Sequence, residues 1–179
     1  MKQVILIAGI GGQGVQVLGK LLAMCANAQG LNVTVDAKYS GNMRGAPSNC
    51  TVIISDRMIG NPVERQCNHL VAFTQEALLK LSFRLTEQGT VWRDSTMAQI
   101  GLEDHLDHAC PACALAQELG NERCANIVMA GFLAAHMEYL DADAMRSCLE
   151  KTLGKKPQWM ELNRKAFECG VRFSADCVE

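Results

Sequence analysis

One stretch near the amino terminus constrains the fold more than any other part of the chain. An apolar run rich in branched side chains, Val4–Ala8, is followed directly by glycines at positions 9, 11, 12 and 14. Apolar residues from Val15 to Cys25 then recur at helical spacing. This order predicts a buried strand, a tight turn and an amphipathic helix. Glycines allow positive φ and close approach, and the helix start offers N–H groups and a positive dipole end. We therefore expect a turn that receives an anionic group or a closely packed chain.

The rest of the chain alternates strands and helices and then becomes helical. Strands are predicted at 31–36, 49–55, 69–74 and 89–93, a helix at 75–85, and an irregular connection at 94–110. Further helices are predicted at 111–119, 125–139, 142–153 and 158–169, with Asp141 as a cap and Gly30, Gly120 and Gly170 as helix ends. Residues 38–48 form a loop that lies beside the glycine turn if the sheet is parallel. The pattern predicts a single α/β domain over residues 1–179.

Composition excludes several classes of partner. The 179 residues carry a net charge of −2, so no basic surface for nucleic acid or an anionic membrane is expected. The longest later apolar block, 127–135, is far shorter than the ~20 residues of a membrane span. The chain enters its first strand without a signal sequence, which predicts a cytoplasmic protein. Nine cysteines in such a compartment are expected to be reduced thiols.

The glycine run also fits the dinucleotide-binding pattern G-x-G-x-x-G. It follows a predicted strand and opens a helix, and Asp36 lies 22 residues after Gly14, near where a ribose-binding acid is expected. No patterned nucleophile, acid or base follows it, and such glycines also occur wherever a helix packs tightly on its strand. A stand-alone dinucleotide-dependent oxidoreductase is therefore the alternative function, and a stand-alone binding or scaffold domain is a third.

A segment with two histidines and two cysteines could bind metal or act in redox chemistry. Cys110 and Cys113 form a Cys-x-x-Cys pair, with His105 and His108 just before them. Zinc sites normally space their ligand pairs further apart, and no basic residue in the segment lowers the thiol pKa. We assign no metal ligand, and the question whether these four residues bind a metal stays open. His69 and His136 lie on apolar segments and are expected to be core or interface residues.

Several motifs together resemble one family along nearly the whole chain. Gly9–Val15 resembles the G-x-G-G-Q-G-V signature of the gamma subunit of 2-oxoacid:ferredoxin oxidoreductases. Tyr39 with Arg44-Gly45 resembles that family's Tyr-Gly-Pro-x-x-Arg-Gly-Gly loop, although Ser40-Gly41 and Ala46 depart from it. Further matches follow in order at Val52–Asp56 with Ile59 and Pro62, Pro111-Ala112 with Leu115-Ala116, Asn126–Gly131, and Asn163, Ala166, Phe167 and Gly170.

The resemblance implies a fold and a function. The fold is a three-layer α/β/α sandwich with a mostly parallel, Rossmann-like sheet and a helical C-terminal third. The family enzyme decarboxylates a 2-oxoacid on thiamine diphosphate, passes electrons through iron–sulfur clusters to ferredoxin and forms an acyl-CoA. These cofactors belong to partner subunits, so this chain is expected to have no cofactor and no catalytic residue of its own. The implied partners are the alpha and beta (thiamine-binding) subunits, a ferredoxin-like subunit and ferredoxin.

The resemblance also marks candidate contacts for CoA phosphate or for a partner subunit. Arg44 can grip a phosphate or carboxylate with two hydrogen bonds, or it can brace its own loop. The nearly uncharged segment Ala125–Tyr139 is either a central core helix or packs partly on another chain. Self-association of the isolated chain stays open. The candidate contact residues are Gly11, Gly12, Gln13, Gly14, Tyr39, Arg44 and Gly45.

Overall fold

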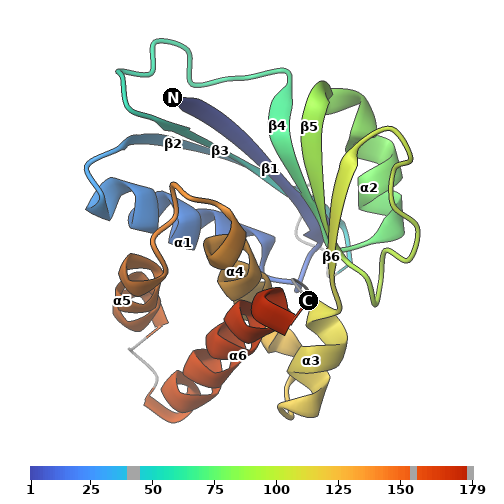
Figure 1. Cartoon of the computed structure of the whole chain (residues 1–179), viewed down its shortest axis with the longest axis vertical. Coiled ribbons are helices and arrows are strands. Elements are labelled where there is room, and N and C mark those ends of the chain that lie inside the picture. The colour runs from blue at the N-terminus through green and yellow to red at the C-terminus, as the bar shows by residue number, and fades with distance from the viewer. Residues whose placement is uncertain (40–44, 154–156, 177–179) are drawn as a thin grey trace.

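The computed structural model describes residues 1–39, 45–153 and 157–176 (Figure 1). A strand and a helix come first, three strands follow in succession, a helix and two further strands come next, and helices make up the last third. The strands are β1 (Lys2–Ile10), β2 (Asn32–Tyr39), β3 (Pro47–Ser55), β4 (Cys67–Ala72), β5 (Leu85–Asp94) and β6 (Leu106–Cys110). The α-helices are α1 (Val15–Ala28), α2 (Gln75–Leu81), α3 (Ala112–Glu118), α4 (Ala125–His136), α5 (Ala142–Leu153) and α6 (Pro157–Asp176), and the short 3₁₀ turns are η1 (Ser82–Arg84) and η2 (Glu122–Cys124).

The sheet is mixed, with strand order β2-β3-β1-β4-β5-β6. The pairs β1–β4, β4–β5 and β5–β6 are parallel, whereas β3 runs antiparallel to both β1 and β2. Five of these six strands therefore share one direction, as the expected mostly parallel sheet requires. Strand β2 does not lie beside β1, because β3 is between them. Too few residues separate β2 from β3 for a parallel crossover, so the two pair as a hairpin and β3 enters between β2 and β1.

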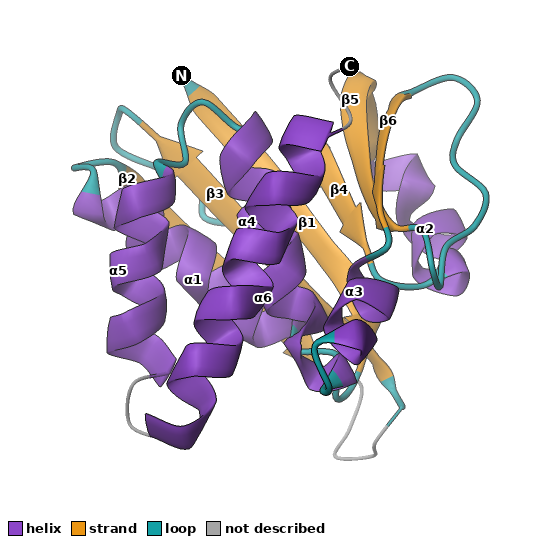
Figure 2. Ribbon diagram, turned by 60° about the horizontal axis from the view of Figure 1, so that its bottom comes forward, coloured by secondary structure: helices purple, strands orange, loops and turns teal. Residues whose placement is uncertain are grey.

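Two apolar cores lie on the two faces of the sheet. Ile5 and Ile7 face the layer formed by α1, α3, α4, α5 and α6, and Leu6 and Ala8 face the side that carries α2 (Figures 1 and 2). Alternation along β1 sends consecutive side chains to opposite faces. The result is the three-layer α/β/α sandwich that was expected, with one layer much thicker than the other.

The strand β6 was missed by the sequence analysis, which predicted an irregular connection at 94–110. β6 pairs in parallel with β5, from Thr90 opposite Leu106 to Asp94 opposite Cys110. Its polar residues make it look irregular, because an edge strand buries little. The Arg93 Nε atom lies 2.8 Å from Asp107 Oδ2, which joins β5 and β6 by an ion pair.

Two helix ends were predicted correctly and one was not. Gly30 and Gly120 follow α1 and α3 with φ of +80° and +90°, as helix-ending glycines do. Gly170 does not end the last helix, since α6 continues to Asp176. A Cβ atom at Gly170 would lie 1.9 Å from the Val128 carbonyl oxygen of α4. The absence of a side chain there permits close helix packing rather than a turn.

The helix α4 is a central core helix. Every residue from Ala125 to Ala134 is buried, against the sheet and against α1, α3, α5 and α6. The sequence predicted a helix that ends at Tyr139, but the helix ends at His136. Residues 125–134 thus form the predicted core helix, and the alternative that part of the segment packs on another chain stays a prediction for residues 135–139.

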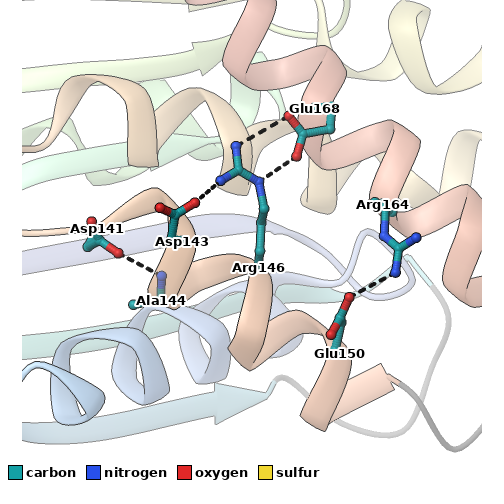
Figure 3. Close-up of polar contacts among 7 residues, drawn as sticks. All are labelled: Asp141, Asp143, Ala144, Arg146, Glu150, Arg164 and Glu168. Carbon is teal, nitrogen blue, oxygen red and sulfur yellow. Dashed lines mark hydrogen bonds and ion pairs between the residues drawn. The ribbon is translucent and has the colours of Figure 1, made fainter.

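Charged side chains join α5 to α6 (Figure 3). The Arg146 guanidinium makes two hydrogen bonds to the Glu168 carboxylate, with Nε–Oε1 at 2.5 Å and a second contact at 3.3 Å, and also pairs with Asp143. Arg164 of α6 donates to Glu150 of α5 at 2.9 Å. The α5 start is capped as predicted, since the Asp141 side chain accepts from the Ala144 N–H at 2.7 Å.

The described helices include none that is long and apolar enough to cross a membrane. Eight cysteines lie in the described ranges, and each is a free thiol, in line with the expected reduced state. Burial raises the pKa of Cys25 to about 12 and the pKa values of Cys50 and Cys67 to about 11. These thiols therefore stay protonated and act as small core side chains.

Candidate functional site

The glycine turn joins β1 to α1 and is held by the start of β3. Gly12 and Gly14 have φ of +106° and +75°, a region that favours glycine. The Gly11 N–H donates to the Ala46 carbonyl at 2.8 Å, and the Gly45 N–H donates to the Gly11 carbonyl at 3.3 Å. The structure therefore brings Gly45 to the glycine turn, as the expected position of the 38–48 loop required.

Gln13 braces this turn from inside. Its Oε1 atom accepts from the Ile10 N–H at 2.9 Å, and its Nε2 atom donates to the Phe73 carbonyl at 3.5 Å. The side chain thus ties the end of β1 to the residue that follows β4. Its hydrogen-bonding groups are engaged within the chain, so its observed contribution is to the shape of the turn.

Two predicted contact residues remain, Tyr39 and Arg44. Tyr39 is the last residue of β2, where its backbone is in register with Ser48 of β3. Arg44 lies outside the described residues. The role assigned to both residues rests on the sequence.

A hollow of about 450 Å³ lies beside the turn, and we call it the glycine-turn pocket. The turn, the first residues of α1 and α4, the η2 turn and the first half of α6 surround it. Its described lining residues are Gly12, Gly14, Val17, Asn121, Arg123, Cys124, Asn126, Ile127, Leu153, Trp159 and Asn163.

Two buried asparagines connect this pocket to the rest of the fold. Asn126 is 4% exposed, and its Nδ2 atom donates to the Gly14 carbonyl at 3.3 Å. Asn163 is also buried, and its Oδ1 atom lies 3.6 Å from the Cys124 sulfur. Both residues belong to the motifs that carry the family resemblance. Their common position explains why two distant segments each carry a buried polar residue among apolar neighbours.

The charges around the pocket favour an anion. The positive dipole end of α1 faces the turn, no acidic residue stands in its first turn, and Arg123 is exposed at the rim. Among the described lining residues Arg123 is the charged one. Burial raises the pKa of the Cys124 thiol, so it is not a ready nucleophile. The arrangement can bind and orient a phosphate or carboxylate, and it holds no nucleophile paired with a base among these residues.

Sequence reasoning missed Arg123 and Trp159 as members of this pocket. Arg123 follows the Asn121 cap of η2, where the Asn121 Oδ1 atom accepts from the Arg123 N–H at 3.1 Å. Trp159 is 42% exposed, which is unusual for so large an apolar side chain. An isolated arginine and tryptophan in the helical third carry no periodic signal, so only their approach to the glycine turn identifies them.

The position of Asp36 argues against the alternative of a dinucleotide-binding site. Its carboxylate lies on β2 and pairs with Lys38, with the two charged atoms 3.4 Å apart. The fingerprint requires the acid on a strand adjacent to the first strand, but here β3 lies between β1 and β2. Asp36 therefore does not stand beside the glycine turn as a ribose-binding acid would.

The side chains of the His105–Cys113 segment contact different parts of the fold and do not converge on one site. The His108 ring stacks on Trp92 at 4.4 Å between centroids, whereas the Cys113 N–H donates to Asp94 Oδ2 at 3.1 Å. Burial, followed by the nearby Asp94, raises the pKa of Cys113 to about 12, so that this thiol is not activated. Within the described ranges, no three His, Cys, Asp or Glu side chains are grouped to hold a metal ion.

Comparison with known proteins gives one consistent result. The model of the pyruvate ferredoxin/flavodoxin oxidoreductase family matches residues 4–173. The ketoisovalerate oxidoreductase subunit VorA of Methanothermobacter marburgensis is 32% identical over 175 residues, which cover 97% of this chain and 37% of VorA. The 2-oxoglutarate synthase subunit KorC of the same organism is 31% identical over 179 residues, covering 95% of each chain.

A solved structure agrees in fold and in sequence. The gamma subunit of a keto/oxoacid ferredoxin oxidoreductase from Geobacter sulfurreducens superposes with a TM-score of 0.83 at 30% identity. The match covers 97% of this chain and 99% of that one. This chain thus corresponds to a whole separate subunit in some relatives, but spans only about a third of the VorA relatives.

Proposed function

The chain belongs to the pyruvate ferredoxin/flavodoxin oxidoreductase family, and from that premise we propose that it is the gamma subunit of a 2-oxoacid:ferredoxin oxidoreductase. The assembled enzyme oxidatively decarboxylates a 2-oxoacid to an acyl-CoA and passes the electrons to ferredoxin. The observation that carries the proposal is the near end-to-end match to KorC and to a solved gamma subunit, each of which has about the length of this chain.

The chain contributes structure and a CoA-proximal surface, and is inactive alone. We assign thiamine diphosphate and the iron–sulfur clusters to partner subunits, as the family resemblance implies. A phosphate fits the glycine-turn pocket, because the space above Gly12 is open and Arg123 stands at the rim. CoA supplies the thiol that accepts the acyl group, and this pocket would hold one of its phosphates.

The partners follow from the same proposal. They are the alpha and beta (thiamine-binding) subunits, a ferredoxin-like subunit and ferredoxin itself. The glycine turn, Gly45, Tyr39 and Arg44 are the proposed contacts with CoA or with a partner carboxylate. We propose a cytoplasmic location for the complex.

Reconstitution tests the function. The chain is co-expressed with candidate partner subunits from the same source, and 2-oxoacid-dependent ferredoxin reduction is measured with and without it. We expect the chain to co-purify with its partners and CoA-dependent turnover to be lost when it is omitted. Turnover by the chain alone, or full activity of the partners without it, contradicts the proposal.

Two arginines test the CoA-proximal role in the assembled complex. Arg123→Ala and Arg44→Ala are each expected to raise the KM for CoA about tenfold with little change in kcat, because each removes a charge-assisted hydrogen bond made in the bound state. Arg57→Ala is the matched control, since Arg57 follows β3 at the opposite end of the sheet. If neither the KM nor subunit assembly changes in the two variants, this role is wrong while the subunit assignment stands.

A further inference from the structure

A second, larger hollow lies at the other end of the sheet from the glycine turn. It measures about 890 Å³ and forms where β1, β4 and β5 begin and α4 ends. Small-molecule sites typically fall between about 300 and 1,000 Å³. We call it the aromatic pocket, and the residues that matter for its chemistry are Gln3, Glu87, Trp92, His136, Glu138 and Tyr139.

A fixed set of rings forms its wall. The Trp92 Nε1–H donates to His69 Nδ1 at 3.2 Å, and His69 Nε2 lies 3.2 Å from Gln3 Oε1. An indole N–H can only donate, so His69 carries its proton on Nε2 and donates it to Gln3. This chain of hydrogen bonds orients Trp92 and keeps the His69 ring neutral.

Further rings surround the same tryptophan. His108 stacks on it, and the His136 ring meets it edge-on with centroids 5.4 Å apart. The Tyr139 ring lies 6.1 Å from the His69 ring, and burial raises the Tyr139 pKa. Tyr139 therefore stays neutral and adds an electron-rich ring to the wall.

The charges at this pocket have one sign. Among its described lining residues the charged ones are Glu87 and Glu138, both exposed, and lysine and arginine are absent from that set. The helix α4 ends here at His136, so its negative dipole end faces the same space. Burial lowers the pKa of His69 to about 4, so no positive charge arises from that ring near neutral pH.

We propose that the aromatic pocket binds a guanidinium- or ammonium-bearing group, with Glu87 and Glu138 as counter-charges and the partly exposed Tyr139 ring as the cation–π face. Trp92 is 4% exposed and lies behind this face, where it reports on the pocket. The pocket is separate from the glycine-turn pocket, and the two have opposite electrostatic preference. The cation is either a free small molecule or a basic side chain of a neighbouring protein.

Fluorescence of Trp92 reports binding directly. The sequence contains two tryptophans, so Trp159→Phe leaves Trp92 as the single emitter. The probe is N-acetyl-arginine amide at constant ionic strength, and the matched control is N-acetyl-citrulline amide, which has nearly the same shape without the charge. We expect a saturable change in emission with the arginine compound and none with the citrulline compound.

Substitution of the two acids checks the assignment. Glu87→Gln with Glu138→Gln is expected to weaken binding about tenfold, through loss of two counter-charges. The control is Glu161→Gln, an exposed residue of α6, which is expected to leave binding unchanged. Both acids are exposed, so folding is retained, and the unfolding midpoint verifies this. A response equal for the two probes, or no saturable response with the arginine compound, overturns the proposal.

The same double variant also identifies the source of the cation. If the two glutamate substitutions abolish co-purification with partner subunits, a basic side chain of a partner occupies the pocket. If assembly is retained while binding of the arginine compound is weakened, the occupant is a free small cation. Activity of the complex is not needed for either readout, so failure here is distinguishable from failure of the proposed function.

Discussion

Gly14 lies where the structure has no space for a side chain. The residue adopts a φ of +75°, and a Cβ atom there would lie 2.4 Å from the Asn126 Nδ2 atom. Asn126 is itself held by a hydrogen bond to the Gly14 carbonyl. The glycine therefore serves both the turn conformation and the close approach of α4 to the start of α1.

A comparison of Gly14→Ala with Gly30→Ala separates the cost of backbone strain at positive φ from the cost of a steric clash with Asn126. Both positions have positive φ, but a Cβ atom at Gly30 would meet nothing within 4 Å. Gly30→Ala is expected to cost about 1 kcal/mol in the free energy of unfolding, from backbone strain alone. Gly14→Ala should cost about 1–3 kcal/mol more, because Asn126 must move. Urea unfolding of both variants measures the difference, and equal losses would show that Asn126 does not close on Gly14.

His69 shows how a single buried ring makes stability depend on pH. It is held by Trp92 and Gln3, and burial, with a smaller effect of His108, lowers its pKa from 6.5 to about 4. The unfolded chain therefore binds a proton more readily than the folded chain between these two values. The neutral His69 ring therefore makes its full contribution to the free energy of unfolding above about pH 6.5. This contribution is lost as the pH falls towards 4.

His69→Gln tests this dependence. Glutamine can accept from the Trp92 N–H and donate to Gln3, so the neutral hydrogen bonds are kept without a titrating group. The loss of unfolding free energy between pH 6.5 and 4 should shrink by about 3 kcal/mol at most relative to the original chain. Denaturant unfolding of both proteins across this pH range gives the difference between their free energies of unfolding. Carboxylate titration affects both proteins alike and cancels in that difference. Parallel pH curves for the two proteins would contradict the prediction.

Among the elements, α4 and α6 pack backbone against backbone at two glycines. Gly131 of α4 faces the Phe167 carbonyl, and Gly170 of α6 faces the Val128 carbonyl, with added Cβ atoms at 2.1 and 1.9 Å. These neighbours are backbone atoms, which cannot rotate out of the way. Two glycines on facing helices therefore set the distance between α4 and α6, and with it the position of Asn163 beside the glycine turn.

Alanine at either crossing glycine is expected to push the helices apart. Gly131→Ala and Gly170→Ala should each lower the free energy of unfolding by about 3 kcal/mol, even though alanine is the better helix former. Gly60→Ala is the control, since a Cβ atom there has open space and an ordinary φ. Thermal unfolding compares the three, and a stabilising effect at Gly131 or Gly170 would show that the helices are further apart than described.

At the scale of the molecule, the sheet order decides which ligands fit. The insertion of β3 between β2 and β1 moves Asp36 away from the glycine turn. The turn has its helix dipole and its glycines, but Asp36 is not placed to bind a ribose beside it. Among the described residues, the fold thus combines a glycine turn, for which we propose an anion, with no acid in the position that a dinucleotide site requires.

The isolated chain is accordingly expected not to bind NADH. NADH fluorescence is titrated with the chain, and Asp36→Ala serves as the comparison. We expect no saturable enhancement for either protein, because the adenosine ribose lacks its partner. Tight binding that Asp36→Ala abolishes would restore the dinucleotide alternative and contradict the sheet order.

The sequence alone determined the features that depend on near neighbours. The first strand, turn and helix, the Asp141 cap and the ends at Gly30 and Gly120 follow from propensities and hydrogen bonds within a few residues. The family resemblance added the layered fold, because its motifs recur in order. Gly11, Gly12, Gln13, Gly14 and Gly45 were correctly grouped around one turn, although their ligand stays a proposal.

Only the tertiary structure decided what depends on contacts distant along the chain. The place of β3, the pairing of β6, the contact of Asn126 with Gly14 and the packing of Gly170 on α4 all join segments many residues apart. A glycine that ends a helix and a glycine that admits another helix look the same in one sequence. The partner that distinguishes them is brought close only when burial of the two apolar cores folds the chain.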